Sequence, residues 1–587
     1  MLHFNYTFWT DNGRTLNKPD LACLRQDHYR YKTLLLQLVG KIEYDSNGIQ
    51  LADKNLATAK FNLFIEKAIA ENVELAITPE YSCPWTSIES FIAAEKLPSE
   101  EKLWIIGCQS IKPKELKDLT GRHNNVVWIY DEALINQSIN ENKFLDPVCL
   151  FFKTKDNNNQ TQNIIVVQFK TCSFGGADSS WERDNFIQGN TFYVIENRIK
   201  STKLVTLICS DTLQNLDFNA VNEGYFLGEA LLLIHIQLNQ KPFESAYKLY
   251  RNMIYMYGLK EDYNKELICL NWARGVSYSE GDTLKIFNKY GGSAFYCKTN
   301  KLDRKKEKIN QNHSKGLYYT NWDDKKSHVY FLNYDEFAFL IDNTKPSQEV
   351  SLPAQRERSG PKIIETYRWN NLWEAVGVVE DGFSQVCAEI EDATGNLICL
   401  KDNNDFTEVE RIIQLSSGEI DISKKEEWYQ IFNLLSFQIG DTEYNQRNTF
   451  SQDPDIPAHE DRKRRIQRYH ILKNSILNDP MQVPIQFANS ILEFDGTLRP
   501  ENNIYLLNLH SKTTGRKGTA IYLGEKTHSE AKAFKANIES YFREDHQGKQ
   551  VMVWYVDTTI KRIYDEDNKP EINENVSKSP VSFKKTK

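Results

Sequence analysis

Three apolar segments in the first half of the chain each end in a side chain that can take part in chemistry. Glu80 follows a run that ends at Pro79, Lys170 follows residues 163–169, and Cys209 ends a run that begins at residue 204. A carboxylate can act as a base, an ammonium can stabilise negative charge, and a thiolate is a strong nucleophile. Taken singly, each has an ordinary explanation: a helix-capping acid, a solvated lysine and a core thiol.

The elements that would position these side chains can be read from the hydrophobic pattern. Between about residues 30 and 330, short apolar runs alternate with segments of helical periodicity, which indicates a layered α/β domain. In such folds, strand ends aim catalytic groups into one crevice, so we expect the three side chains to converge. The expected strands are residues 33–37, 74–79, 103–108, 163–169, 204–209, 230–236 and 266–270, and the expected helices are residues 56–71 and 246–257.

The domain boundaries follow from composition. Residues 341–362 contain three prolines, mixed charge and no periodicity, and are expected to be a linker. It would separate an N-terminal extension (1–30) and a first domain (31–340) from a C-terminal α+β or α/β region (363–587), which could comprise two subdomains. The polar, lysine-rich tail from about residue 566 is predicted to be disordered. The elements expected in the C-terminal region are helices at residues 426–437, 462–477 and 529–543 and strands at residues 503–509 and 550–556.

The order glutamate, lysine, cysteine, each directly after a strand, resembles the nitrilase (carbon–nitrogen hydrolase) superfamily over about residues 31–320. The resemblance implies a nitrilase-like αββα sandwich that pairs into a homo-oligomer, and a catalytic triad of Glu80, Lys170 and Cys209. The matching segments are residues 34–37, 78–80, 105–107, Lys170 with 186–189, 207–211, 228–233 and 269–275.

This resemblance implies hydrolysis of non-peptide carbon–nitrogen bonds in a small amide or nitrile. Cys209 would attack the substrate carbon, Glu80 would act as general base, and Lys170 with the backbone N–H of Ser210 would stabilise the oxyanion. A thioester would form and then be hydrolysed. This chemistry needs no metal and no organic cofactor.

Several positions depart from the family pattern. Ser210 stands where an aromatic residue is usual, and Asp211, in place of glutamate, is more typical of amidase-type members. Glu182 is the nearest match to a second glutamate that many members carry. The glycine-rich phosphate loop expected of glutamine-dependent NAD synthetases does not occur after residue 340. The substrate, and the choice between amide and nitrile, therefore stay open.

Composition limits the class of protein. The chain has 587 residues, 40% of them hydrophobic, and a net charge of −8, as expected for a globular protein with no overall attraction to nucleic acid or anionic membranes. No apolar run is long enough to span a bilayer, and the first residues lack signal-peptide features. The ten cysteines are scattered without a Cys-x-x-Cys pair, which favours a reduced, cytoplasmic protein without structural zinc.

The C-terminal region contains one basic segment, residues 459–473, with helical periodicity. Arg462, Lys463, Arg465 and Arg468 are candidate phosphate contacts for nucleic acid. The alternative is a solvated face or an interface with the acidic remainder of the chain.

The sequence favours an amidase-type hydrolase whose C-terminal region senses a signal, recruits a protein partner or controls access to the site. Two alternatives stay open. One is a catalytically silent nitrilase-like scaffold or ligand-binding protein, although the presence of Glu80, Lys170 and Cys209 argues against it. The other is an antiviral-defence effector that hydrolyses a small metabolite on a nucleic-acid or phage cue.

Overall fold

The computed structural model divides the chain into two compact units, residues 1–386 with 431–459 and residues 387–430 with 460–587. Each unit is considered by itself. The structure describes residues 3–5, 9–10, 15–26, 30–45, 48–173, 180–199, 202–213, 231–239, 265–280, 283–287, 293–298, 315–321, 327–344, 360–377, 413, 415–419, 464–465, 467–485, 487–488, 490–494, 507–540, 551–558, 561–565 and 567.

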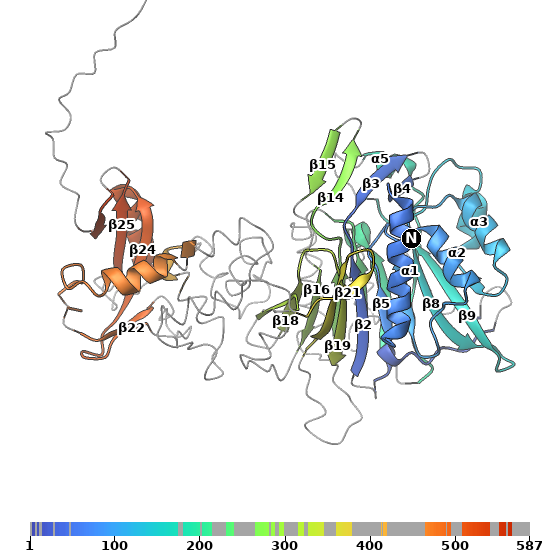
Figure 1. The fold of residues 1–587 in the computed structure, drawn as a ribbon, viewed down its shortest axis with the longest axis horizontal. Helices are drawn as coiled ribbons and strands as arrows, with labels where there is room; N and C mark the ends of the chain where they lie inside the picture. Colours follow the sequence, from blue (N-terminus) through green and yellow to red (C-terminus); the bar gives the residue numbers. More distant parts are fainter. Residues whose placement is uncertain are drawn as a thin grey trace, which may run out of the picture. The chain divides into compact units, whose positions relative to one another are not determined.

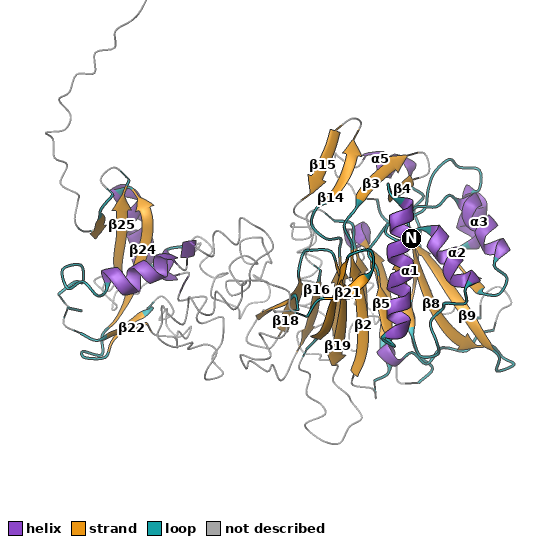
Figure 2. Ribbon diagram, viewed as in Figure 1, coloured by secondary structure: helices purple, strands orange, loops and turns teal. Residues whose placement is uncertain are grey.

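The first unit is built on a nine-stranded sheet (Figures 1 and 2). Strands β2, β5 and β6 are parallel, whereas β8 runs antiparallel to both β6 and β9. The ends of β5, β6 and β9 and the start of β8 therefore lie at one edge of the sheet. In sheet order the strands are β21 (Trp373–Ala375), β20 (Lys362–Trp369), β19 (Phe337–Thr344), β2 (Arg30–Gln37), β5 (Leu75–Ile77), β6 (Leu103–Gly107), β8 (Pro147–Lys155), β9 (Thr161–Phe169) and β7 (Val127–Ile129).

A second, six-stranded sheet packs face to face with the first. Alternation along β2 shows the layering: Leu35 belongs to the core shared by the two sheets, whereas Leu34 and Leu36 belong to the core beneath the helices. Strands β11, β12 and β13 are parallel, so their ends also share one edge. In sheet order the strands are β11 (Lys203–Ile208), β12 (Leu231–Ile236), β13 (Lys265–Leu270), β16 (Ala294–Lys298), β18 (Ser327–Leu332) and β17 (Leu317–Asn321).

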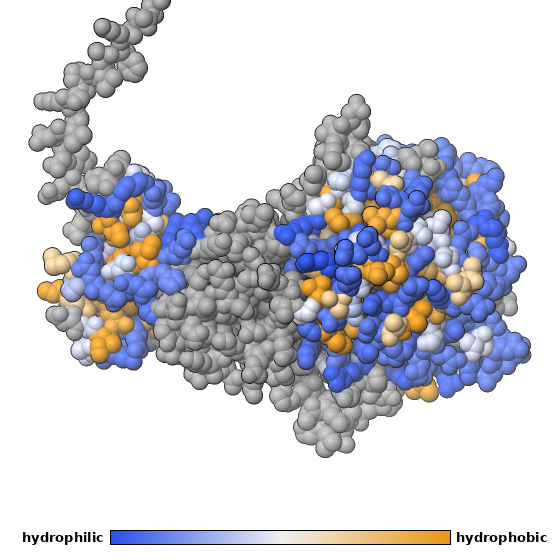
Figure 3. Space-filling model, viewed as in Figure 1, coloured by the Kyte–Doolittle hydropathy of each residue, from blue (hydrophilic) through white to orange (hydrophobic). Residues whose placement is uncertain are grey.

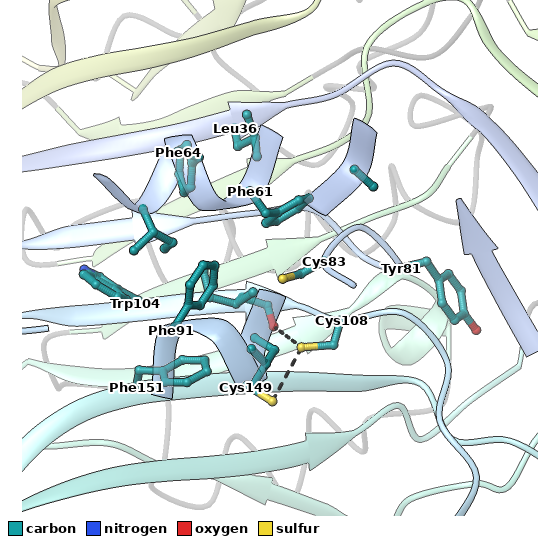
Figure 4. Close-up of a cluster of buried hydrophobic side chains, with 14 of the residues drawn as sticks. Leu36, Phe61, Phe64, Tyr81, Cys83, Phe91, Trp104, Cys108, Cys149 and Phe151 are labelled. Atoms are coloured by element: carbon teal, nitrogen blue, oxygen red, sulfur yellow. Dashed lines mark hydrogen bonds between the residues drawn. The ribbon is translucent and has the colours of Figure 1, made fainter. Parts of the chain in front are cut away.

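Helices cover the outer face of the nine-stranded sheet (Figure 1). The longest, α1, begins after Asp53, whose carboxylate accepts the backbone N–H of Leu56. Its Phe61 and Phe64 face the sheet in an aromatic and sulfur-containing core beside Trp104 (Figure 4). The helices are α1 (Lys54–Ala70), α2 (Trp85–Ala93), α3 (Pro113–Arg122), α4 (Glu132–Ser138) and α5 (Ser180–Asn185).

Shorter pairings complete this unit. Strand β3 (Lys41–Asp45) joins β4 (Gly48–Leu51) and β14 (Val276–Glu280), and β14 also pairs with β15 (Thr283–Phe287). Strand β1 (His3–Asn5) pairs in parallel with β10 (Thr191–Tyr193). Residues 1–30 were expected to be an extension, but Trp9 and Leu21 lie buried in the core between the sheets.

The layered α/β prediction is confirmed for three layers: helices, sheet and sheet. The helix expected at residues 246–257, on which a fourth layer would depend, lies outside the described residues. The predicted end of the first domain at residue 340 and the linker at 341–362 need correction. Strand β19 crosses residue 340, and β20 and β21 extend the same sheet to Ala375 by antiparallel pairing. The prolines interrupt the connection between β19 and β20, but they do not end the domain.

The second unit contains a five-stranded sheet. Strands β24 and β25 are parallel and are joined through α15, whose capping box at Thr527 and Glu530 fixes its start. A hairpin connects β23 to β24, and in it Gly515 has φ +68°. The strand expected at residues 503–509 overlaps β23 only at Leu509, and the helix expected at 426–437 lies outside the described residues. The elements are β22 (Leu492–Phe494), β23 (Leu509–Ser511), β24 (Lys517–Lys526), α15 (His528–Glu539), β25 (Val551–Asp557) and β26 (Ile563–Asp565).

The basic segment of the second unit is partly used for internal contacts. Arg465 is 4% exposed and lies 3.6 Å from Glu419, and Arg468 donates to the same carboxylate at 3.0 Å and to the carbonyl of Ser417. These contacts favour the alternative of an interface with acidic parts of the chain over phosphate binding by Arg465 and Arg468. Arg462 and Lys463 lie outside the described residues.

The surface of the first unit in the view of Figure 3 is mainly hydrophilic, with apolar residues between. On α1, Leu56 and Ile69 are 40% and 44% exposed, and single apolar side chains of this kind are normal on a protein surface. Within the described ranges, no helix is both long enough and apolar enough to cross a membrane.

Candidate active site

The site is centred on the buried ammonium of Lys170, directly after β9. Its Nζ donates to Oε1 of Glu80 at 2.7 Å and to Oε1 of Glu182 at 2.6 Å. Glu80, Lys170 and Glu182 are 1%, 2% and 7% exposed, so the three charges meet away from solvent. Burial alone would lower the pKa of Lys170, but Glu182, Glu80 and Asp146 outweigh burial and raise it well above its usual range. The ammonium therefore stays charged.

Glu80 is fixed by contacts to both its side chain and its backbone. Its Oε2 accepts the backbone N–H of Leu238 at 2.5 Å, and its carbonyl accepts the indole N–H of Trp272 at 2.8 Å. Both partners follow strands of the second sheet, β12 and β13. The next residue, Tyr81, has φ +55° and donates its hydroxyl to Oε1 of Glu182 at 2.9 Å. Glu80 thus bridges the two sheets at their common edge.

Cys209 lies at the end of β11 and starts the short 3-10 helix η4 (Cys209–Leu213). It is buried and has φ +40°, a strained conformation for a residue with a Cβ. Such strain concentrates at functional sites, because the surrounding structure must enforce it. The carbonyl of Cys209 lies 2.9 Å from Nε2 of His235, whose Nδ1 is 3.0 Å from Nε2 of Gln237. Cys209 also contributes to the raised pKa of Lys170, so the thiol and the ammonium are electrostatic neighbours.

The residues after Cys209 tie its strand end to that of Lys170. Asp211 accepts the backbone N–H and the hydroxyl of Thr171 at 2.7 and 2.8 Å, and the N–H of Ile208 at 2.8 Å. Burial raises the pKa of Asp211 to about 6, and these hydrogen bonds oppose the increase. The hydroxyl of Ser210 donates to the carbonyl of Cys172. The serine that replaces the usual aromatic residue therefore fastens β11 to the segment after β9.

One acidic member of the site was missed by the sequence analysis. Asp146 is fully buried at the start of β8, and its Oδ2 lies 3.5 Å from Nζ of Lys170. Its carbonyl accepts the backbone N–H of Lys170 at 2.9 Å. The available signal was an acid immediately before the apolar run 147–152. Asp146 precedes a strand and does not follow one, and it reaches the site because β8 is antiparallel and brings its start to the edge where β6 and β9 end.

Other cysteines in this unit contrast with Cys209. Cys83, Cys108 and Cys149 lie in the apolar core beneath the helices, where Sγ of Cys108 is 3.5 Å from Sγ of Cys149 (Figure 4). Burial raises the pKa of the Cys83 and Cys108 thiols well above their usual range, which keeps them protonated and unreactive.

Three carboxylates, those of Glu80, Asp146 and Glu182, have ligand atoms within 4.8 Å of one another, as a metal site would require. The ammonium of Lys170 already lies against all three, at 2.6 to 3.5 Å. It supplies the positive charge that this arrangement needs, and we assign no metal to it.

The structure brings Glu80, Lys170 and Glu182 into direct contact, and Cys209 lies within electrostatic range of Lys170. This fold and this site define an α/β sandwich with a buried Glu–Lys cluster next to a strained cysteine. No protein-family model matches the sequence. A search of curated proteins likewise gives no match.

The structure is similar to solved structures of the carbon–nitrogen hydrolase superfamily. A glutamine-dependent NAD+ synthetase from Acinetobacter baumannii is 12% identical with a TM-score of 0.31, over 62% of this chain and 53% of that chain. This chain thus spans about half the length of that enzyme. A CN-hydrolase superfamily protein from Xanthomonas campestris is 12% identical with a TM-score of 0.27, over 46% of this chain and 82% of that chain.

A mutant amidase from Nesterenkonia sp. AN1 carries the acetamide moiety of fluoroacetamide on its active-site cysteine. It is 13% identical with a TM-score of 0.25, over 46% of this chain and 84% of that chain.

Proposed function

We propose that this protein is a thiol-dependent hydrolase of carbon–nitrogen bonds, of the amidase type. The observation that carries the proposal is the charged Lys170, held by Glu80 and Glu182 beside a cysteine in a strained backbone conformation. Burying such charges costs stability compared with an apolar core, so a chemical use is the better explanation.

In the proposed reaction, Glu80 takes the proton of the Cys209 thiol, and the sulfur attacks the amide carbon. The oxyanion of the tetrahedral intermediate is stabilised by Lys170 and the backbone N–H of Ser210. The C–N bond breaks, the leaving amine takes the proton from Glu80, and a thioester forms. Glu80 then removes a proton from water, whose oxygen attacks the thioester, and the carboxylic acid leaves as the thiol is restored.

The role of Glu182 in this reaction is to hold Lys170 together with Glu80 and to fix Tyr81. With two carboxylate partners, the ammonium stays charged throughout the reaction and cannot swing out of the site. Each loss of a positioned charge of this kind is expected to reduce the rate on the order of 10²- to 10³-fold.

The proposal is tested by intact-mass measurement and ammonia release with a panel of small amides and nitriles. The native protein should form an acyl adduct, and Cys209→Ala should lose the adduct and at least about 10⁴-fold in rate. Cys297→Ala, a change of an equally buried cysteine in β16, is the matched control and should keep both. No adduct and no ammonia from any compound, or an adduct that persists in Cys209→Ala, would refute the proposal.

A further inference from the structure

Asp146 is a buried acid that has no role in the proposed reaction, and its charge state needs an explanation. The ammonium of Lys170 has three N–H donors. Two of them serve Glu80 and Glu182 at 2.7 and 2.6 Å, whereas Asp146 is 3.5 Å away, beyond ordinary hydrogen-bond length. Among the described residues, no group donates a hydrogen bond to either carboxyl oxygen of Asp146. A fully buried carboxylate without a donor is strongly disfavoured.

The other two carboxyl groups have the partners that Asp146 lacks. Glu80 accepts from Lys170 and from the backbone of Leu238, and Glu182 accepts from Lys170 and from Tyr81. If all three carboxyl groups were ionised, the single ammonium of Lys170 would leave two net negative charges in a site closed to solvent. The proton that relieves this repulsion belongs on the carboxyl group with the poorest hydrogen bonding, which is Asp146.

We propose that Asp146 is a positioning residue that stays protonated in the resting enzyme and donates its O–H to Glu80. One carboxyl oxygen of each residue lies within 4.8 Å of the other, and a side-chain hydrogen bond with Glu80 is among the causes that raise the pKa of Asp146. The backbone of Asp146 is held in place by the bond from the N–H of Lys170 to its carbonyl. This inference rests on the proposed function for its catalytic meaning. With Asp146 neutral, the positive charge of Lys170 remains available to the oxyanion that forms on the Cys209 adduct.

The electrostatic surroundings agree with this assignment. Burial raises the pKa of Asp146 well above its usual range, Glu80 and Glu182 add to the increase, and Lys170 opposes it. Tyr81 and Cys108 also lie within electrostatic range of Asp146, because an ionised Asp146 would raise the pKa of both. Cys209 interacts with the same cluster through Lys170. Loss of the Asp146 proton at alkaline pH would place a third negative charge beside Lys170, so activity should fall there.

Infrared spectroscopy tests the protonation state without any substrate. Protein with carbon-13 in the aspartate carboxyl groups alone is compared with unlabelled protein at about pH 8, where Asp211, with a pKa of about 6, is ionised. A carboxylic-acid carbonyl band from aspartate should be present and should disappear in Asp146→Asn. Asp156→Asn, a change in the exposed β8–β9 turn, should remove only a carboxylate band. Absence of the acid band from the native protein would overturn the inference.

Activity gives a second readout. Asn keeps the size and neutrality of a protonated aspartic acid and can donate to Glu80, so Asp146→Asn should stay within about tenfold of the native kcat/KM. It should also lack the alkaline fall in activity that Asp146 causes. A folded Asp146→Asn variant with a larger loss, or with an unchanged alkaline limb, would contradict the inference. If the acid band is present but no acyl adduct forms on Cys209, the proposed function fails while the protonated state of Asp146 stands.

Discussion

The close packing of Gly107 against Pro79 and Glu80 gives a quantitative prediction. A Cβ added at Gly107, the last residue of β6, would lie 2.1 Å from the carbonyl oxygen of Pro79 and 3.0 Å from Cα of Glu80. An ordinary contact needs roughly 3.4 Å or more, so the Pro79 carbonyl would have to move by more than about 1 Å in Gly107→Ala. The obstacle is backbone, which cannot rotate aside as a side chain would.

That displacement should affect the site more than the fold. The segment after Pro79 is tied to Gly107, whose carbonyl accepts the N–H of Cys83 at 2.8 Å and the hydroxyl of Ser82 at 3.0 Å. Overpacking of this kind costs about 1–3 kcal/mol in the free energy of unfolding. A shift of about 1 Å at Glu80 would lengthen its bonds to Lys170 and Leu238 beyond hydrogen-bond range and should lower the rate about 10²-fold.

Urea unfolding measures the stability loss, and ammonia release together with the rate of Cys209 alkylation by iodoacetamide measures the loss at the site. Gly121→Ala in α3 is the matched control, because a Cβ there meets nothing within 4 Å. It should keep native activity and gain about 0.5–1 kcal/mol from the lost flexibility of glycine. Native activity and stability in Gly107→Ala would refute the reasoning.

Three further perturbations probe the charges and contacts of the site. Lys170→Met should lower the free energy of unfolding by about 3–5 kcal/mol near neutral pH, because it leaves buried carboxylates without a positively charged partner. Urea unfolding should show that this loss becomes smaller in acid, where the carboxylates are protonated. A loss that does not depend on pH would contradict this. The pKa of Asp211 is about 6 against 3.8 unfolded, so its contribution to stability should fall by roughly 3 kcal/mol in total as pH rises from about 3 to 7. Asp211→Asn should lack that fall in unfolding curves measured across this range, and parallel curves for the two proteins would disprove it. Trp272→Phe removes the 2.8 Å hydrogen bond from the indole N–H to the Glu80 carbonyl, and it should lower the free energy of unfolding by about 1 kcal/mol and reduce the activity. Unchanged thermal unfolding of this variant would show that the bond does not contribute to stability.

Much of the first unit is predictable from the chain because its strands are locally encoded. Strands β5, β6, β9, β11, β12 and β13 each contain a short apolar run, as expected for strands buried on both faces. The extent of the domain was not predictable in this way. Strand β20, second from the edge of the sheet, mixes buried and exposed residues and follows a proline-containing connection, so its sequence pattern resembles the start of a separate region.

The residue types and the order of Glu80, Lys170 and Cys209 follow from the amino-acid sequence, since each comes shortly after a strand whose apolar pattern is local. Which acids meet Lys170 depends on the tertiary structure. Glu182 reaches it from a short helix, and Asp146 reaches it because β8 runs antiparallel and brings the residue before its start to the edge where β6 and β9 end. Strand direction is set by long-range pairing, which no local pattern of residues records. The protonation that we propose for Asp146 likewise follows only from the tertiary structure, because it depends on three carboxyl groups and one ammonium sharing one buried space.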